Sequence, residues 1–467
     1  MRGLRVRAVL CCCSIGLLGR SARAETPAPG PPTITSLRYT EDYSYLRDPK
    51  NRSGAWWEPL KFIPVDSAGW AYLTLGDEAR LRFEHYTNNE FGTATPPNES
   101  YLRYRHLPYA DLHLGSHFRT FFQLQLAWGT REMPNPFIDQ TGFDIVQAFL
   151  ELTLPVGSDG RLTVRGGRQV LIYGSGRLIN AGPNIRTSFA GGVASLDVGG
   201  WRLDALLVRP VKPELAWFDD HADSTRLLWG LYVARTLSQK PHQGFDLFYI
   251  GFENTAAVFN QGMGRELRHT FGTRPFYSGH GWFVELESHF QTGTFSGSRI
   301  TAWLVGLQSR YTFRYTPLQP WLGMRADIFS GDRNPQQPGL QTYNAMFPEG
   351  GYFGESGVIG PGNLIGIHPA IGADFGHGVT AYTAIAFYWR ESLDDGTYGI
   401  GGNVVRADMG SRSRYITTQI DVAAGWAATP TLSLYAAYSF LAPGQFIADT
   451  GPAPDVQFVG AHIQLRF

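Results

Sequence analysis

The C-terminal stretch, residues 455–467, alternates apolar and polar positions up to its last residue. The apolar set is Val459, Ala461, Ile463, Leu465 and Phe467, and the polar set is Gly460, His462, Gln464 and Arg466. A period of two places the two sets on opposite faces of a β-strand. In a closed barrel the apolar face meets lipid and the backbone is paired on both sides, whereas an open soluble sheet would aggregate through it. The pattern predicts an outer-membrane β-barrel.

Other segments separate two faces in the same way. Apolar positions alternate with polar ones in three sets: Ala79, Leu81 and Phe83 against Glu78, Arg80, Arg82 and Glu84; Phe122, Leu124, Leu126 and Trp128 against Arg119, Gln123 and Gln125; and Val379, Ala381, Ile385, Phe387 and Trp389 against Tyr382, Tyr388 and Arg390. One face suits hydrocarbon and the other suits water. Trp128, Trp389 and Trp426 come near expected strand ends, where an interfacial aromatic belt is expected. A β-sandwich core is the alternative interpretation.

The links between the candidate strands alternate in length. Short links lie at 115–117, 155–160, 199–200, 238–244, 276–281, 315–319, 376–378 and 428–431, and long links at 87–100, 129–142, 173–190, 210–224, 330–362, 391–413 and 442–454. Short periplasmic turns and long external loops are typical of outer-membrane barrels. We therefore predict an all-β fold, a transmembrane antiparallel up-and-down β-barrel of about eighteen strands, with both chain ends in the periplasm.

The N-terminus has the features of a secretory signal. A basic start (Arg2, Arg5, Arg7) and an apolar run over residues 8–18 precede the small-x-small site Ala22-Arg23-Ala24. We expect a signal peptide at 1–24, a periplasmic segment at 25–69 and the barrel at 70–467, in the outer membrane of a Gram-negative cell. All cysteines lie at 11–13, inside the expected signal. A lipidated cysteine is the alternative processing route.

Composition favours many strands joined by glycine-rich turns, since 14% of residues are aromatic, 17% are charged and 55 are glycine. Basic and acidic residues balance at 40 each, but residues 1–24 hold only basic ones, so the mature protein is mildly acidic and no nucleic-acid partner is expected. Nearly every cation is arginine, whose planar guanidinium matches a carboxylate in two-point geometry. Such a lumen suits a polyanion. A GC-rich genome, which encodes arginine by default, is the alternative explanation.

Arginines recur on the face predicted to be luminal. They are Arg80, Arg82, Arg103, Arg105, Arg165, Arg325 and Arg390, and they are interleaved with Glu78, Glu84, Glu285, Glu287 and Asp327. A few arginines at a constriction are sufficient for anion selectivity. A structural ion-pair network that stiffens the wall is the alternative role for each of them.

Several irregular motifs resemble the bacterial alginate export porins. They are YTEDYSYLRDPKNRSGAWWEPLKFIPV at 39–65, RGGRQVLIYGSGRLINAGPNIRTSF at 165–189, RHTFGTR at 268–274, and MRADIFSGDRN, FPEGGYFGE and GPGNL within 324–364. The resemblance implies a monomeric eighteen-stranded channel with an arginine-rich constriction, through which a uronate polysaccharide crosses the outer membrane by facilitated diffusion. It also implies that Arg105, Arg168, Arg186, Arg325 and Arg390 line the pore, and that the last strand, ending at Phe467, is recognised by the barrel assembly machinery.

Other functions compete with polysaccharide export. A general anion or small-metabolite porin is the main alternative. An outer-membrane hydrolase would need a serine and a histidine on adjacent outward positions or a Gly-x-Ser-x-Gly elbow, and neither is found. A barrel plugged or gated by residues 330–362 is a third hypothesis.

We expect no cofactor and no metal. The sequence Gly331-Asp332-Arg333-Asn334 favours a plain turn over a calcium loop, and Tyr173–Arg177 favours a tight turn at the barrel rim over a phosphate-binding loop.

Overall fold

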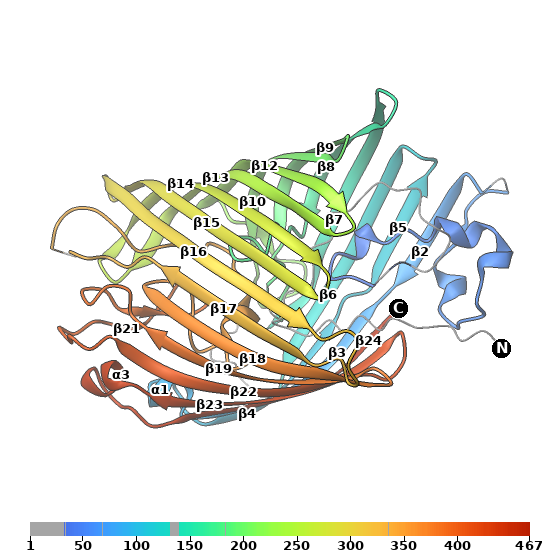
Figure 1. Ribbon diagram of the computed structural model, residues 1–467. Helices are drawn as coiled ribbons and strands as arrows, with labels where there is room; N and C mark the ends of the chain where they lie inside the picture. Colours follow the sequence, from blue (N-terminus) through green and yellow to red (C-terminus); the bar gives the residue numbers. More distant parts are fainter. Residues whose placement is uncertain (1–31, 33, 68, 131–139, 183, 335) are drawn as a thin grey trace.

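The computed structural model describes residues 32, 34–67, 69–130, 140–182, 184–334 and 336–467, and the expected signal peptide at 1–24 lies outside them. The chain forms a closed barrel of 18 antiparallel wall strands (Figure 1). In chain order these are β2 (Ala71–Gly76) continued by β3 (Glu78–Thr87), β4 (Glu99–His106) continued by β5 (Tyr109–Leu114), β6 (Phe118–Gly129), β7 (Thr141–Val156), β8 (Gly160–Gln169), β9 (Phe189–Val198), β10 (Trp201–Lys212), β12 (Arg226–Gln239), β13 (His242–Phe259), β14 (Gly262–Gly279), β15 (Trp282–Phe295), β16 (Ser298–Thr312), β17 (Trp321–Phe329), β18 (Leu364–Gly376), β19 (Val379–Trp389), β22 (Tyr415–Ala427), β23 (Leu432–Pro443) and β24 (Val456–Arg466). The predicted fold class and strand number are confirmed.

The barrel closes between its last and first strands. β24 pairs with β3 in a continuous antiparallel register, from Gln457 opposite Thr87 to Arg466 opposite Glu78. The first wall strand is interrupted at Asp77, whose N–H and C=O pair with the C=O and N–H of Phe467, each at 3.2 Å. The second is interrupted before β5, where Pro108 has no N–H to donate to the ladder.

Short links gather at one end of the barrel and long links at the other, which we call the short-turn end and the long-loop end. Both the start of β2 and the end of β24 lie at the short-turn end. The links after β13 and β15 are exceptions at the long-loop end. They are two-residue turns at 260–261 and 296–297, because these strands extend further before they reverse.

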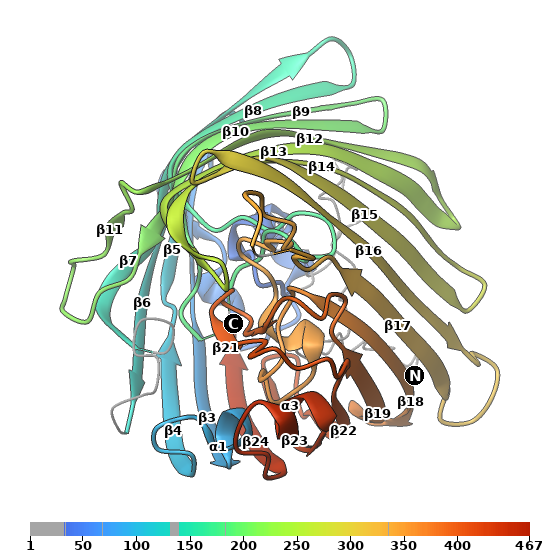
Figure 2. The same cartoon turned by 90° about the vertical axis from the view of Figure 1, so that its left-hand side faces the viewer.

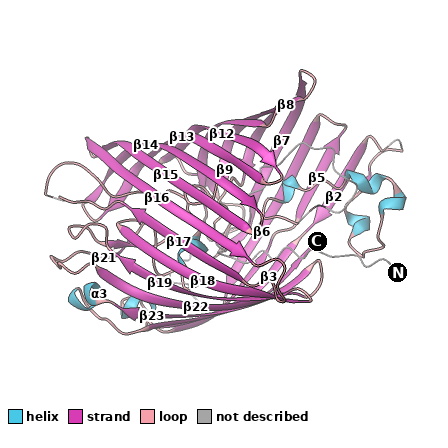
Figure 3. Cartoon of the chain, in the orientation of Figure 1, coloured by secondary structure: helices cyan, strands magenta, loops and turns pink. Residues whose placement is uncertain are grey.

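The remaining elements are short (Figure 3). They are the 3-10 helices η1 (Arg38–Thr40), η2 (Ser44–Arg47), η3 (Pro49–Asn51), η4 (Glu58–Leu60) and η5 (Gly350–Phe353), the helices α1 (Asn89–Gly92) and α3 (Gln445–Asp449), and the strands β1 (Ile63–Pro64), β11 (His221–Ala222), β20 (Thr397–Tyr398) and β21 (Val404–Arg406). Within the described ranges, no helix has the length and apolar character needed to cross a membrane.

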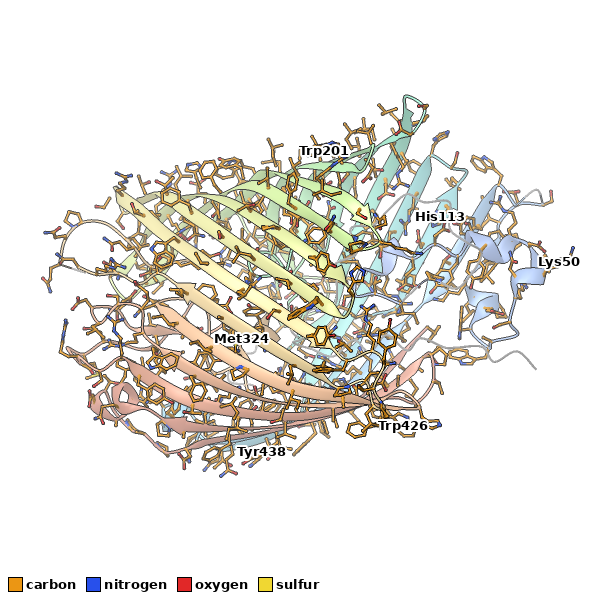
Figure 4. All side chains as sticks on the ribbon, in the orientation of Figure 1. Lys50, His113, Trp201, Met324, Trp426 and Tyr438 are labelled. Carbon is orange, nitrogen blue, oxygen red and sulfur yellow. The ribbon has the colours of Figure 1, made fainter. Side chains whose placement is uncertain are left out.

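The wall separates apolar from polar side chains as the alternation predicts. On β3 and β24, Leu81 and Ile463 are each 44% exposed, whereas Arg80 and Gln464 are buried on the inner side. Trp201, Trp426 and Tyr438 lie on the outer surface (Figure 4). Large apolar side chains on the outside of a closed barrel face hydrocarbon rather than water, so this surface is the lipid-facing one.

The N-terminal segment, residues 34–67, is fastened to the barrel at the closing seam. Arg38 Nη2 donates to the carbonyl oxygen of Phe467 at 2.7 Å and to the hydroxyl of Tyr109 at 3.2 Å. Lys61 Nζ donates to the Leu75 carbonyl at 2.8 Å and to the Tyr109 hydroxyl at 2.9 Å. Both cations are almost fully buried. Beyond the end of β24, β1 pairs with β2 and continues the ladder.

The buried Lys61 makes docking of the N-terminal segment depend on pH. Burial, together with the nearby Arg38 guanidinium, lowers the pKa of Lys61 from 10.5 to about 7. An undocked Lys61 keeps its proton up to the higher value, so docking strengthens as the pH rises from 7 towards 10.5, by about 1.4 kcal/mol for each pH unit.

We expect trypsin to cleave after Arg47 and Lys50 progressively more slowly, relative to a Lys61→Met variant, as the pH is raised from 7 to 9.5. The pH dependence of trypsin itself cancels in this ratio, because both chains are digested under the same conditions. A ratio that does not change with pH would contradict the buried, titrating lysine.

Candidate functional site

The barrel encloses a cavity of about 3450 Å³. It is lined by the N-terminal segment, by the inner faces of wall strands and by loops, and in Figure 2 the chain around residues 341–363, coloured orange, lies inside the ring of strands. Basic and acidic side chains share the lining, and the basic ones include Arg80, Arg82, Arg105, Arg165 and Arg186. The cavity is therefore a charged lumen that several inserted segments narrow.

One inserted segment is the link between β8 and β9, residues 170–188. These two strands have 10 residues each, against 18 in β13 and β14, so the chain leaves the wall part-way up and enters the lumen. It forms backbone hydrogen bonds with the link after β17: Asn180 N–H donates to the Phe347 carbonyl at 2.8 Å, and Phe347 N–H donates to the Leu178 carbonyl at 3.0 Å. The two links are joined into one body inside the barrel.

Arg177 anchors this body to the opposite wall. Its Nη1 lies 3.1 Å from Glu285 Oε1 and 2.8 Å from Glu287 Oε2 on β15, and its Nε lies 3.4 Å from Asp327 Oδ1 on β17. The Tyr352 hydroxyl accepts from Arg177 Nε at 3.1 Å and donates to Asp327 at 2.8 Å. Burial opposes the charge, but Tyr352, Asp327 and the glutamates raise the pKa of Arg177 well above its ordinary value. Arg177 stays charged and holds the constriction together.

The N-terminal segment narrows the lumen from the short-turn end. The Tyr39 ring packs against Phe149 at 5.4 Å and against Phe121 at 6.0 Å. Its hydroxyl donates to the Val170 carbonyl at 3.0 Å, and the Arg165 guanidinium lies over its ring at 4.1 Å. Tyr39 thus connects the N-terminal segment to the first residue of the inserted 170–188 link.

A concentration of positive charge lies on the wall formed by β24, β3 and β4. The arginine cluster, as we call it, consists of Arg80, Arg82, Arg103, Arg105, Arg186 and Arg466, all of which line the cavity. The antiparallel register places Arg80 directly opposite Arg105, and Arg82 directly opposite Arg103. Like charges in directly opposed positions destabilise a sheet. Two such pairs in succession are therefore an arrangement that stability alone does not favour.

Two glutamates hold the arginine cluster in place. Glu84 pairs with Arg82 at 2.6 Å and with Arg103 at 2.8 Å. Glu78 pairs with Arg105, with Arg466 at 3.1 Å and with Arg186 at 3.4 Å. Arg80 Nη2 donates to Asn184 Oδ1 at 2.6 Å. Six guanidinium groups around two carboxylates leave the cluster with a positive excess.

The structure divides the sequence-predicted arginines into two groups. Arg80, Arg82, Arg103, Arg105, Arg165 and Arg186 line the cavity, and all but Arg165, which pairs with Glu151 on another part of the wall, belong to the arginine cluster. Arg168, Arg325 and Arg390 are placed outside the cavity lining.

These three arginines tie loops to the barrel. Arg168 donates to the carbonyls of Ile145 and Asp220 at 2.5 and 2.8 Å. Arg325 donates to the Tyr352 carbonyl and lies over the Tyr352 ring at 4.9 Å. Arg390 is fully buried and donates to carbonyls of residues 393, 395, 411 and 413. The strand pattern predicted Arg325 and Arg390 on the luminal face, and the family resemblance implied Arg168 in the pore. Their hydrogen-bond partners are instead loop carbonyls and, for Arg168, also the Ile145 carbonyl of β7.

Sequence reasoning missed Arg177, Tyr352 and Tyr39. Arg177 and Tyr352 lie in links and Tyr39 lies in the N-terminal segment, where no period-two pattern shows the direction of a side chain. Tyr173–Arg177 does form a turn, with Gly176 N–H donating to the Tyr173 carbonyl at 3.0 Å, but it lies inside the lumen and not at the rim. The position of Arg177 directly after a glycine-rich turn was the one feature of the sequence that could have pointed to this residue.

Within the described part of the chain, one carboxylate group has metal-like spacing, formed by Asp144, Asp219 and Asp220 within 4.8 Å. Arg168 already lies 3.4 Å from Asp144. We therefore assign no metal to it.

Residues 71–459, from the start of β2 into β24, match the alginate export family. The chain belongs to the alginate export family. This family member is an outer-membrane channel and not an enzyme. No curated protein matches the chain.

Solved porin structures share the fold of this alginate export family member. Pseudomonas aeruginosa OccK2 (OpdF) in complex with glucuronate is 11% identical, with a TM-score of 0.53 over 87% of this chain and 99% of that chain. Pseudomonas aeruginosa OpdK with vanillate is 8% identical, with a TM-score of 0.54 over 87% and 99%. Acinetobacter baumannii OccAB1 is 12% identical, with a TM-score of 0.52 over 84% and 97%. At these identities the similarity concerns the fold alone.

Removing the Arg177 charge should loosen the constriction. In Arg177→Gln, three buried carboxylates lose their shared cation, which destabilises such a site by about 3–5 kcal/mol. We expect larger and noisier single-channel currents in a planar bilayer. Arg412→Gln is the matched control, because the Arg412 side chain is 69% exposed and pairs with Asp394, whose side chain is itself 41% exposed. Currents of Arg177→Gln identical to those of the control would show that Arg177 does not hold the constriction.

Proposed function

We propose that this channel exports an anionic uronate polysaccharide of the alginate type by facilitated diffusion, and that the arginine cluster guides the polymer. The observation that carries the proposal is the two pairs of opposed arginines on β3 and β4, Arg80 with Arg105 and Arg82 with Arg103. A lumen that needed only structural ion pairs would place acids opposite these bases. A local positive excess instead favours a passing anion.

The chemistry of a uronate polymer fits several weak contacts in a row. Each sugar unit carries one carboxylate, and an arginine can bind it through two parallel hydrogen bonds. Conduction requires that each contact is strong enough to attract the chain and weak enough to release it. Glu78 and Glu84 compete with the substrate for the same guanidinium groups and thereby weaken each contact.

A general porin for small anions is the second candidate. Two fold relatives favour it, because OccK2 was solved in complex with glucuronate and OpdK with vanillate, and each of these ligands carries a single carboxylate. The two candidates differ in how binding depends on ligand length. An exporter of polymer engages several arginines at once, so block should strengthen as an oligouronate grows, whereas a small-anion porin gains nothing beyond the monomer.

We expect the double variant Arg82→Gln, Arg103→Gln to reduce anion selectivity, measured as the reversal potential in a salt gradient. Block by an oligouronate should weaken about tenfold or more, because each lost charge-assisted hydrogen bond contributes about 1.5–3 kcal/mol. The effect should shrink at high salt, since screening weakens charge contacts in the wild type as well.

The matched control is Arg265→Gln, Arg412→Gln. It removes the same charge from side chains that are 61% and 69% exposed, outside the lumen. If the control shifts selectivity as much as the cluster variant does, overall charge and not the arginine cluster determines selectivity. If block does not depend on oligouronate length, the small-anion porin is the better description.

A further inference from the structure

The link between β10 and β12 differs from the other long links, because part of it faces away from the lumen. β11 pairs back onto the end of β10, with Val211 opposite Ala222 and Lys212 opposite His221. In Figure 2 the chain around β11 stands on the outer side of the ring of strands, next to β7. We call residues 213–220 the outer flap.

The outer flap displays a run of large apolar side chains. Leu215 is 52% exposed, Trp217 is 72% exposed and Phe218 is 58% exposed. None of them lines the cavity, although Pro213 and Asp220 at the two ends of the flap do. Keeping each such side chain in water forgoes about 1.5–3 kcal/mol of burial free energy. Three within four residues therefore indicate a surface that something apolar covers.

The flap is held in one conformation by its own hydrogen bonds. Glu214 N–H donates to Asp220 Oδ1 at 2.7 Å, and Ala216 N–H donates to Asp219 Oδ2 at 3.2 Å. Phe218 has a positive φ of 55°, which side chains rarely adopt without support. The hydrogen bonds of the flap therefore fix its apolar side chains in their exposed positions.

The flap is also docked on the outside of β7. Asp220 N–H donates to Asp144 Oδ2 at 2.9 Å, and Phe218 N–H donates to the Phe143 carbonyl at 3.1 Å. At Gly142 a Cβ atom would lie 2.0 Å from the Ala216 carbonyl oxygen, so only glycine permits this approach. Arg168 of β8, which lies outside the cavity lining, donates from Nη2 to the Asp220 carbonyl at 2.8 Å and so holds the flap to the next wall strand as well.

The docking position coincides with the edge of the lipid-facing surface. Ala127 on β6 pairs with Thr141 on β7, so Trp128 lies about two residues nearer the long-loop end than Gly142, where the flap is seated. Trp128 is 59% exposed and lies at the long-loop end of its strand. Tryptophan at a strand end is typical of the membrane interface. The flap continues this belt around the barrel.

We propose that the outer flap is a membrane-contact element, whose Leu215, Trp217 and Phe218 insert into the interfacial layer of the lipid leaflet at the long-loop end. The lipid contact of this barrel then extends beyond its wall strands to one loop. Arg168 on β8 connects the flap to the wall. This inference does not depend on which anion the channel carries.

The test uses site-specific fluorophores in a full chain whose cysteines at 11–13 are replaced by alanine. Trp217→Cys and Phe218→Cys are each labelled with a polarity-sensitive dye and reconstituted into phosphatidylcholine vesicles that contain lipids with a nitroxide at the headgroup or shallow acyl position. Met409→Cys, which is 72% exposed on the link after β19, is the water-facing control, and Leu207→Cys, 59% exposed on β10, is the wall control.

We expect the flap labels to be quenched at least several-fold more than the Met409→Cys label and to emit at shorter wavelength. Quenching equal to that of the Met409→Cys label would overturn the proposal, because the flap would then lie in water. Low quenching combined with efficient disulfide formation between two chains at residue 217 would also overturn it, in favour of a contact between copies.

A second variant tests the docking itself. Adding Gly142→Val to Trp217→Cys should reduce quenching at residue 217 to the water-facing level, because the side chain displaces the flap. The Leu207→Cys label should keep its quenching in the same background, which shows that the barrel remains folded and inserted. Unchanged quenching at residue 217 would contradict the docked arrangement.

Discussion

The closing ladder between β24 and β3 is the interaction on which the rest of the structure depends. Lipid offers no hydrogen-bond partners, so each backbone N–H and C=O in the membrane must be paired within the protein, and a sheet achieves this only by closing. Here closure runs from Gln457 opposite Thr87 to Arg466 opposite Glu78, and the Asp77–Phe467 pair extends it by one step. The N-terminal segment then continues the ladder with β1 and fastens the seam through Arg38. The two ends of the chain therefore stabilise the same joint.

Closure also determines where charge can lie. With lipid outside, ionised groups in the middle of the wall, such as Arg80 and Glu84, point inward, where a narrowed lumen of low dielectric strengthens both attraction and repulsion. On one side, Arg177 satisfies Glu285, Glu287 and Asp327 and holds the inserted links. On the other, Glu78 and Glu84 hold a cluster with more arginines than acids. The network around Arg177 makes the constriction rigid. The arginine cluster keeps a repulsion between its guanidinium groups, which a bound anion would relieve.

The fold was largely predictable from the sequence, because a period of two and the alternation of link lengths follow directly from barrel geometry. The closing strand, its outward face and the number of wall strands all followed from these patterns. The division at residue 70 and the processing of the N-terminus stay predictions. The candidate site was less predictable. The strand register could identify the arginines of β3 and β4 as neighbours. A strand pattern cannot show that Arg168, Arg325 and Arg390 donate hydrogen bonds to carbonyl oxygens of loops. It also cannot show that Arg177, which lies in a link, reaches across the lumen.

Efflux from vesicles tests the central claim most directly. The wild-type channel is reconstituted into liposomes loaded with a fluorescent oligouronate or with a neutral oligosaccharide of equal length, and release is followed at low and high salt. We predict faster release of the uronate at low salt and convergence of the two rates when salt screens the arginine cluster. Equal rates at low salt, or faster release of the neutral sugar, would contradict it.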